Sequence, residues 1–326
     1  MHSTNVRRRI SLMTSLMLLF AFWLVSSPVA NVLSVAGLPW RVVSSSSPGT
    51  EAILYGVSTL STTLGDAWAV GNYTSKAGQV KTLIERWDGS SFKVVSSPSV
   101  ANTPNILRSV SVLSANNAWA VGDTGSIQGT QTLTEHWNGT SWQIVPSPNP
   151  GFYNYLNAVT VVSANNAWAV GRWDTEHGVV STLIEHWNGS NWQVISSPNV
   201  TDFNELYVVT AISGKNVWAV GSYLTFRGDG AAINQTLTEH WNGTSWQVVP
   251  SPGVANLSNT ITGMTAVSSS NIWIVGNLYD RSPKLRHLGQ AYLLFGSCFN
   301  VGSFTCLFRQ ARASYSTSVL CVDETH

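Results

Sequence analysis

A five-residue phrase, Ala-Trp-Ala-Val-Gly, recurs along this chain at intervals of about 50 residues, and it constrains the fold more than any other feature. Its copies, some of them inexact, end at Gly71, Gly122, Gly171, Gly221 and Gly276. A unit of this length cannot bury its own apolar face, so neighbouring units must stack on one another. Strand-built repeats of about 40–50 residues are typical of β-propellers. We therefore expect an all-β fold of stacked blades.

The unit at residues 156–198 shows how four strands fit into one repeat. Alternating or β-branched segments lie at residues 157–162, 167–171, 182–187 and 191–195, and a Ser-Pro pair follows the last one. In four of the units an Asn-Gly or Asp-Gly pair separates the third segment from the fourth, which predicts a tight type I′ hairpin turn. Each unit is therefore predicted to be a four-stranded antiparallel blade.

Thirteen of the 15 tryptophans occupy equivalent positions in the repeats. A tryptophan can bury roughly 150–250 Å² of surface. We predict that these rings pack between adjacent blades rather than bind sugar. The predicted set is Trp68, Trp119, Trp168, Trp218 and Trp273 on second strands, Trp87, Trp137, Trp187 and Trp241 on third strands, and Trp40, Trp142, Trp192 and Trp246 on fourth strands.

The two ends of the repeat region complement each other. Residues 40–45 resemble a fourth strand that precedes the first complete unit, whereas the last unit has two strands and a degraded third at residues 290–295. We predict five blades, closed by pairing of residues 40–45 with residues 290–296, because closure removes open sheet edges. Residues 296–326 follow no repeat and fit a tail, a distorted fourth strand at 301–308 or a reading-frame error. A reading-frame error would imply an incomplete ring of six or seven blades.

The N-terminus has the order of a secretory signal. Three arginines at 7–9 precede a mostly apolar stretch at 10–25, and a small-residue site at 34–36 follows. The apolar stretch is shorter than the roughly 20 residues that span a bilayer, so a cleaved signal is preferred over an uncleaved anchor. We expect a signal peptide or membrane anchor at 1–36, a β-propeller at 37–297 and a tail with all three cysteines at 298–326. The protein is expected outside the cytoplasm, secreted or tethered.

Charge excludes some partners. Charged residues make up 10% of the chain, against about 25% in ordinary soluble domains, and the net charge is +1. Such a chain has no field that would gather nucleic acid or an anionic membrane. We expect a monomer that needs no cofactor, and membrane contact only through an uncleaved N-terminal segment.

The loops on the two sides of a propeller differ here. The loops between second and third strands, and those that lead from one blade into the next, emerge on one side, which we call the variable face because they differ in length and content, as at 172–180 and 222–234. Binding groups sit on loops held by a rigid scaffold, although loop drift explains the variation equally well. The candidates are Trp173, Arg172, Asp174, Glu176, His177, Tyr223, Phe226, Arg227, Asp229, Tyr153, Tyr155, Phe203, Tyr279, Asp280, Arg281 and His287.

Trp173 is the strongest of these candidates. The blade pattern does not require a tryptophan at this position. An exposed tryptophan offers a stacking plane for a sugar or a peptide.

Catalysis has no positive signal in the sequence. Glu-His pairs recur on the third strands at 135–136, 185–186 and 239–240. Neighbouring residues on a strand point to opposite faces, so these pairs cannot act together. We expect each glutamate to be buried and to accept a hydrogen bond from an indole or backbone donor. The weaker alternative is a metal site formed by the histidines. No nucleophile elbow, zinc helix, phosphate loop or calcium loop occurs.

The chain resembles secreted bacterial β-propeller repeat proteins whose units carry Ala-Trp-Ala-Val-Gly and Glu-His-Trp-Asn-Gly-Thr-Ser-Trp. The likeness covers about residues 40–296 and implies a propeller of unassigned function. More distantly, Gly-Thr-Ser-Trp at 139–142 is similar to the end of the Asp-box of sialidase-like propellers, but the aspartate is absent. The chain also lacks the glycine doublet of kelch repeats.

Three functions remain open at this stage. The preferred one is a non-catalytic extracytoplasmic binding or adhesion module that recognises a glycan or an extracellular protein through its variable face. The alternatives are a secreted polysaccharide hydrolase or lyase that uses carboxylates of this face, and a structural spacer at the cell surface.

Overall fold

The computed structural model describes residues 43–298 except residues 46, 61–66, 127, 252, 254–256, 270 and 280–290. The chain divides into two compact units, Met1–Ser44 and Ser45–His326, and all the strands belong to the second. The expected signal segment and most of the cysteine-containing tail lie outside the described residues. Within the described part there is no helix, and so none that is long and apolar enough to cross a membrane.

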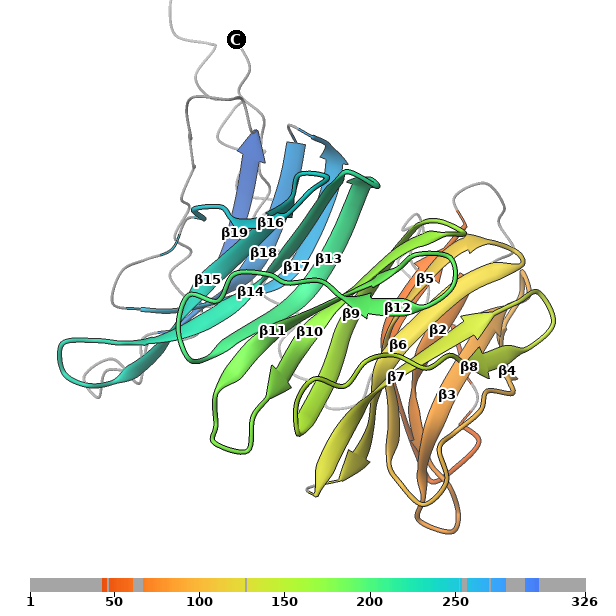
Figure 1. The fold of residues 1–326 in the computed structure, drawn as a ribbon. Helices are drawn as coiled ribbons and strands as arrows, with labels where there is room; N and C mark the ends of the chain where they lie inside the picture. The colour runs from red at the N-terminus through yellow and green to blue at the C-terminus, as the bar shows by residue number, and fades with distance from the viewer. Residues whose placement is uncertain are drawn as a thin grey trace, which may run out of the picture. The chain divides into compact units, whose positions relative to one another are not determined.

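Five antiparallel blades follow one another along the chain (Figure 1). The first consists of β1 (Glu51–Thr59), β2 (Ala67–Thr74), β3 (Val80–Trp87) and β4 (Phe92–Val95). The second consists of β5 (Asn105–Ser114), β6 (Asn117–Ser126), β7 (Gly129–Trp137) and β8 (Trp142–Ile144). The third consists of β9 (Tyr153–Ser163), β10 (Asn166–Asp174), β11 (Val180–Trp187) and β12 (Trp192–Val194).

The fourth blade consists of β13 (Asn204–Ser213), β14 (Asn216–Phe226), β15 (Ala232–Trp241) and β16 (Trp246–Val248). The described part of the fifth consists of β17 (Ser258–Ser268), β18 (Asn271–Tyr279) and β19 (Ala291–Cys298). Within each blade the strands are hydrogen-bonded in sequence order, and the first strands of successive blades contact one another. The predicted all-β propeller of four-stranded antiparallel blades is confirmed.

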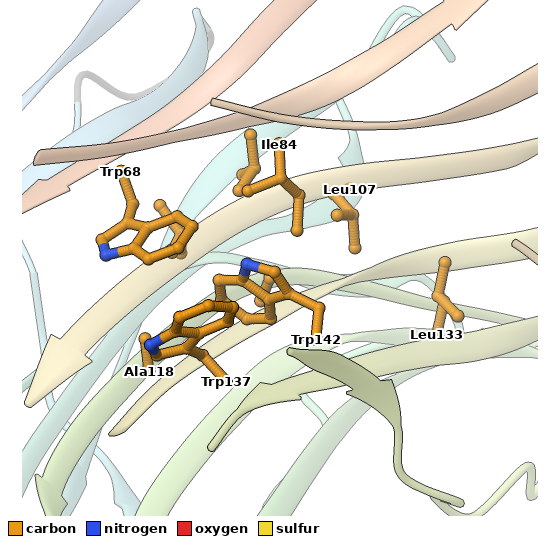
Figure 2. Packing of buried hydrophobic residues seen from close by; sticks show 10 residues of the cluster. Trp68, Ile84, Leu107, Ala118, Leu133, Trp137 and Trp142 are labelled. Carbon is orange, nitrogen blue, oxygen red and sulfur yellow. The ribbon is translucent and has the colours of Figure 1, made fainter. Parts of the chain in front are cut away.

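Most of the predicted tryptophans fill junctions between blades, whereas the ring of Trp87 lies 5.3 Å from that of Phe92 in its own blade and Trp40 lies outside the described residues. Trp68 of β2 lies with its ring centroid 5.0 Å from that of Trp137 and 5.2 Å from that of Trp142, both in the next blade (Figure 2). The same triad recurs as Trp119 with Trp187 and Trp192 at 4.8 and 4.9 Å, and as Trp168 with Trp241 and Trp246 at 5.0 and 5.5 Å. The central tryptophan of each triad is at most 1% exposed. Each triad therefore removes a large apolar area from water at one junction.

The junction between the fourth and fifth blades is built differently. Trp218 of β14 is 6% exposed and packs in a cluster with Ile261, Ile272 and Ile274 of the fifth blade. The described part of this junction thus has isoleucines around the second-strand tryptophan.

The turns between third and fourth strands differ from the predicted type I′ hairpins. Trp137 pairs with Trp142, so four residues form the connection. Only glycines have positive φ there, as Gly139 does at 98°, whereas a type I′ turn needs positive φ at both central residues. The side-chain oxygen of Asn138 instead accepts hydrogen bonds from the backbone N–H groups of Thr140 and Ser141 at 2.9 and 3.0 Å. The Asn-Gly signal found the turn, but the amide side chain sets its geometry.

The predicted pairing of residues 40–45 with residues 290–296 is not formed by the described residues. Residues 43–45 belong to no strand, and β19 pairs only with β18. The Ser45 hydroxyl instead donates a hydrogen bond of 2.8 Å to the buried carboxylate of Glu85 in the first blade, because that group needs a partner. Ser197 lies near Glu239 of the next blade, but neither carboxyl oxygen of Glu239 accepts a hydrogen bond from the described residues.

The outer face of the first blade is partly exposed. Leu54 of β1 is 40% exposed, whereas its equivalents Leu107, Leu156 and Leu206 are fully buried against the preceding blade. The described residues provide no such cover for Leu54. Closure of the ring remains a prediction.

The repeated glutamates are buried, but three of them lack the expected donor. Glu135, Glu185 and Glu239 are 0% exposed, and no carboxyl oxygen of these residues has a hydrogen-bond partner among the described residues. Burial raises the pKa of Glu135 and Glu185 well above the usual value. Burial thus favours the neutral acid over the carboxylate in both groups.

Candidate functional site: two grooves on the variable face

Buried asparagines anchor the loops of the variable face. Asn154, at the start of β9, is 1% exposed and accepts a hydrogen bond from the Gly151 N–H at 2.9 Å. Its amide group donates to the carbonyl oxygens of Thr130 and Gly151 at 2.9 and 2.8 Å. Asn105 and Asn204 hold the equivalent loops of their blades. Sequence reasoning missed these anchors, although each stands two residues before a Leu or Ile of the core.

Two grooves lie side by side on this face. The β6–β7 groove, of about 520 Å³, lies between the β6–β7 hairpin and the loop that enters β9. The β2–β3 groove, of about 530 Å³, lies between the β2–β3 hairpin and the loop that enters β5. Val100 and Thr103 line both grooves. The grooves therefore share a wall, made by the loop between β4 and β5.

The β6–β7 groove carries no ionisable side chain, and more of its lining is apolar than polar. Hydroxyl and amide groups line it, and the exposed side chains of Gln128 and Gln131 form no hydrogen bond with the described residues. The ring of Phe152, 37% exposed, lines the same groove. Its centroid lies 4.8 Å from that of the Tyr153 ring, and the two rings are perpendicular. Free amides next to an aromatic face suit a ligand that has both neutral polar groups and an apolar side.

Two glycines shape this groove. Gly125 has φ of 137°, and a Cβ there would lie 2.4 Å from the carbonyl oxygen of Gly129 across the hairpin. A Cβ at Gly151 would lie 2.8 Å from Cε3 of Trp173. Neither position has room for a larger residue without movement of the backbone or of the indole.

Trp173 supports the groove from below and is not the exposed plane that the sequence suggested. It is half-buried and packs against the cluster that contains Trp119 and Leu156. The reason is that β10 continues to Asp174, beyond the repeat phrase, so Trp173 belongs to the strand and its ring folds onto the core. The exposed ring that the sequence reasoning missed is Phe152, in the loop that Gly151 lets approach Trp173.

Arg172 joins three other residues into an ion-pair network. Its Nη1 donates to Glu205 at 3.0 Å, its Nε lies 3.3 Å from Asp174, and its guanidinium stacks over Tyr155 at 4.7 Å. Burial raises the pKa of Asp174, against the pull of Arg172. The network ties the third blade to the fourth.

Glu205 has both of its carboxyl oxygens bonded, whereas the buried Oδ1 of Asp174 accepts no hydrogen bond from the described residues. The other oxygen of Glu205 accepts a hydrogen bond from Asn157 at 3.0 Å, so both of its oxygens have partners. Asp123, which the sequence did not single out, pairs with Arg108 at 2.6 Å. Burial raises the pKa of Asp123, and Arg108 opposes that shift. Glu205 and Asp123 are thus each held by an arginine of the same face.

The remaining candidates do not converge on the grooves. Glu176 and His177 are exposed at the tip of the β10–β11 hairpin. Phe226 is 69% exposed near the tip of the β14–β15 hairpin, where Arg227 pairs with Asp229. Half-buried positions hold Tyr153, Tyr223 and Phe203. The side chain of Tyr279 and residues Asp280, Arg281 and His287 lie outside the described residues.

The histidines of the repeats are separate from one another in their bonding. His136 lies 4.6 Å from the ring of Trp119, and its Nε2 is 3.2 Å from the side-chain oxygen of Asn117. His186 and His240 repeat this arrangement with Asn166 and Asn216. In the described part of the chain, no three His, Cys, Asp or Glu side chains gather as metal ligands. Each of these three histidines therefore contacts an asparagine of its own blade.

Comparison with known proteins does not assign this chain to a family. No protein-family profile and no curated protein matches the sequence. Solved structures with some likeness include YCF48 bound to D1 peptide, at 14% identity over 86% of this chain and 88% of that chain, with a TM-score of 0.44. They also include YCF48 from Cyanidioschyzon merolae, at 15% identity over 79% and 72%, with a TM-score of 0.45. An α-L-arabinanase mutant from Cellvibrio cellulosa is 7% identical over 76% and 92%, with a TM-score of 0.37. Function must therefore be argued from the residues of this chain.

Proposed function

We propose that this protein is a non-catalytic glycan-binding module whose β6–β7 groove takes a neutral sugar. The observation that carries the proposal is the lining of that groove, which combines hydroxyl groups, free amides and the ring of Phe152 with no ionisable side chain. A sugar ring presents hydroxyl groups at its edges and C–H groups on its faces. It can therefore bond the amides of Gln128 and Gln131 while one face rests on Phe152.

Charge and rigidity support a neutral ligand. A phosphate or carboxylate ligand needs a cationic partner, and the β6–β7 groove supplies none. The loop that carries Phe152 is held by Asn154 and by a backbone hydrogen bond from the Thr130 N–H to the Phe152 carbonyl at 3.1 Å. A site held in place before binding loses little conformational entropy when the ligand enters.

The setting that we propose is outside the cytoplasm. Support comes from the order of charged, apolar and small residues in the first 36 positions. Polysaccharides of cell walls and surfaces would be accessible to the protein there.

Phe152→Ala is expected to weaken binding of a neutral oligosaccharide about tenfold, which corresponds to about 1.4 kcal/mol. The reason is that the substitution removes the apolar face of the groove and leaves its polar groups in place. Isothermal titration with cellohexaose, mannohexaose and xylohexaose measures the affinity of the wild-type chain and of the variant. The proposal expects at least one of the three to bind.

Phe226→Ala is the matched control. Phe226 is a more exposed phenylalanine on the same face, and it does not line either groove. Its replacement is expected to leave the affinity unchanged. An equal loss in both variants, or no binding of any neutral oligosaccharide by the wild-type chain, would overturn the proposal.

A further inference from the structure

We infer that the β6–β7 groove and the β2–β3 groove are consecutive subsites for one extended glycan chain, an inference that rests on the proposed function. Val100 and Thr103 line both grooves, so a ligand that leaves one groove meets the other directly. A protein that recognised only the end of a glycan would need a single closed pocket. Adjoining open grooves of similar volume suit a polymer that passes through both.

The wall between the grooves is fixed. Asn105, 1% exposed, accepts a hydrogen bond from the Val100 N–H at 2.8 Å and donates to the Val100 carbonyl at 2.9 Å. The Thr103 hydroxyl lies 2.7 Å from the Thr124 hydroxyl on β6, which joins the wall to the β6–β7 hairpin. Val100 is 37% exposed and forms a low apolar ridge between the two grooves. A flexible glycan chain can therefore pass over Val100 while these hydrogen bonds hold the loop between β4 and β5 in place.

The two grooves arise from the same part of consecutive blades. Each lies between the hairpin of second and third strands and an inter-blade loop, and amide or hydroxyl side chains line both. The β2–β3 groove differs in two ways: no aromatic residue lines it, and Lys81 places one positive charge there. The ammonium group can donate hydrogen bonds to sugar hydroxyls as the amides do. Repetition of the blade thus repeats the polar part of the subsite but not its aromatic ring.

The inference predicts that affinity depends on chain length. For the sugar type that binds, the hexasaccharide is expected to bind at least tenfold more tightly than the disaccharide, because only the longer chain reaches the second groove. Ala101→Trp tests the second groove, since Ala101 is exposed and lines the β2–β3 groove alone. The added indole should abolish the gain from length and leave the affinity for the disaccharide unchanged. Titration calorimetry with the di-, tetra- and hexasaccharide measures both.

Ser190→Trp is the control for an added indole, because Ser190 is exposed in a turn between third and fourth strands, away from the grooves. It should keep the full gain from length. If affinity does not change with length while Phe152→Ala still weakens binding, the inference of two subsites fails and the proposed function stands. If Ala101→Trp keeps the gain, the second subsite lies elsewhere and the inference also fails. If no oligosaccharide binds, the proposed function itself fails.

Discussion

Replacing Trp168 with alanine is expected to lower the free energy of unfolding by about 3–5 kcal/mol. Trp168 is 1% exposed, and its ring lies 5.0 Å from Trp241 and 5.5 Å from Trp246 of the next blade. The substitution leaves a cavity between two blades that packing cannot readily close. Urea unfolding, followed by circular dichroism, gives the change in the transition midpoint.

A double-mutant cycle makes this test specific to the junction between blades. Trp168→Ala and Trp241→Ala should show a coupling free energy of about 0.5–3 kcal/mol, because the two rings are in contact. Phe226→Ala, at an exposed position, should change stability by no more than about 0.5 kcal/mol. A loss below about 1 kcal/mol for Trp168→Ala would contradict the role given to the triads.

Glu239→Gln is expected to remove part of a loss of stability that the wild-type chain suffers as the pH rises from about 4.5 to about 8. Burial raises the pKa of Glu239 to about 8, against a small opposing effect of Ser197. The folded chain therefore keeps a proton that the unfolded chain releases. The stability linked to this group is fully present below its ordinary pKa of 4.5 and is lost as the pH rises through about 8.

The measurement compares slopes between pH 6.5 and 8. Burial lowers the pKa of His136, His186 and His240, but both chains carry all three, so their contribution to the slope cancels in the comparison. Within this range the unfolding free energy of the wild-type chain should fall more steeply than that of Glu239→Gln, by up to about 1.4 kcal/mol per pH unit. Urea unfolding at three pH values measures both slopes. Glu176→Gln, on an exposed hairpin, should follow the wild-type slope, and equal slopes for all three chains would refute the neutral buried acid.

The blade and its packing could be predicted from the sequence because the same strand pattern and tryptophan positions recur in each repeat. Trp168 alone indicates little. Tryptophans at the same position in consecutive units are not a chance occurrence, and they indicate packing between blades rather than exposure at the surface. The period of about 50 residues gave the blade, and the alternation gave its four strands. Trp173 shows the limit of this logic. It stands outside the pattern, yet an extension of β10 by a few residues was enough to turn its ring onto the core.

The site was harder to predict because it depends on contacts between loops. Phe152 lies in a run of aromatic residues, Gly-Phe-Tyr-Asn-Tyr, and no periodicity tells which ring stays exposed. Arg172 and Asp174 were found as candidates, but their partner Glu205 lies in the next blade and entered no sequence pattern. The buried glutamates were placed correctly in the interior. Their lack of donors depends on the packing of whole blades.

The most direct test of the account is the crystal structure of this protein with a bound neutral hexasaccharide chosen by titration. The account predicts one sugar ring against Phe152, with hydroxyl groups bonded to the amides of Gln128 and Gln131, and the chain continuing over Val100 into the neighbouring groove. A sugar bound instead at the Arg172 network, or at the Asn-Gly turns on the opposite face, would contradict it.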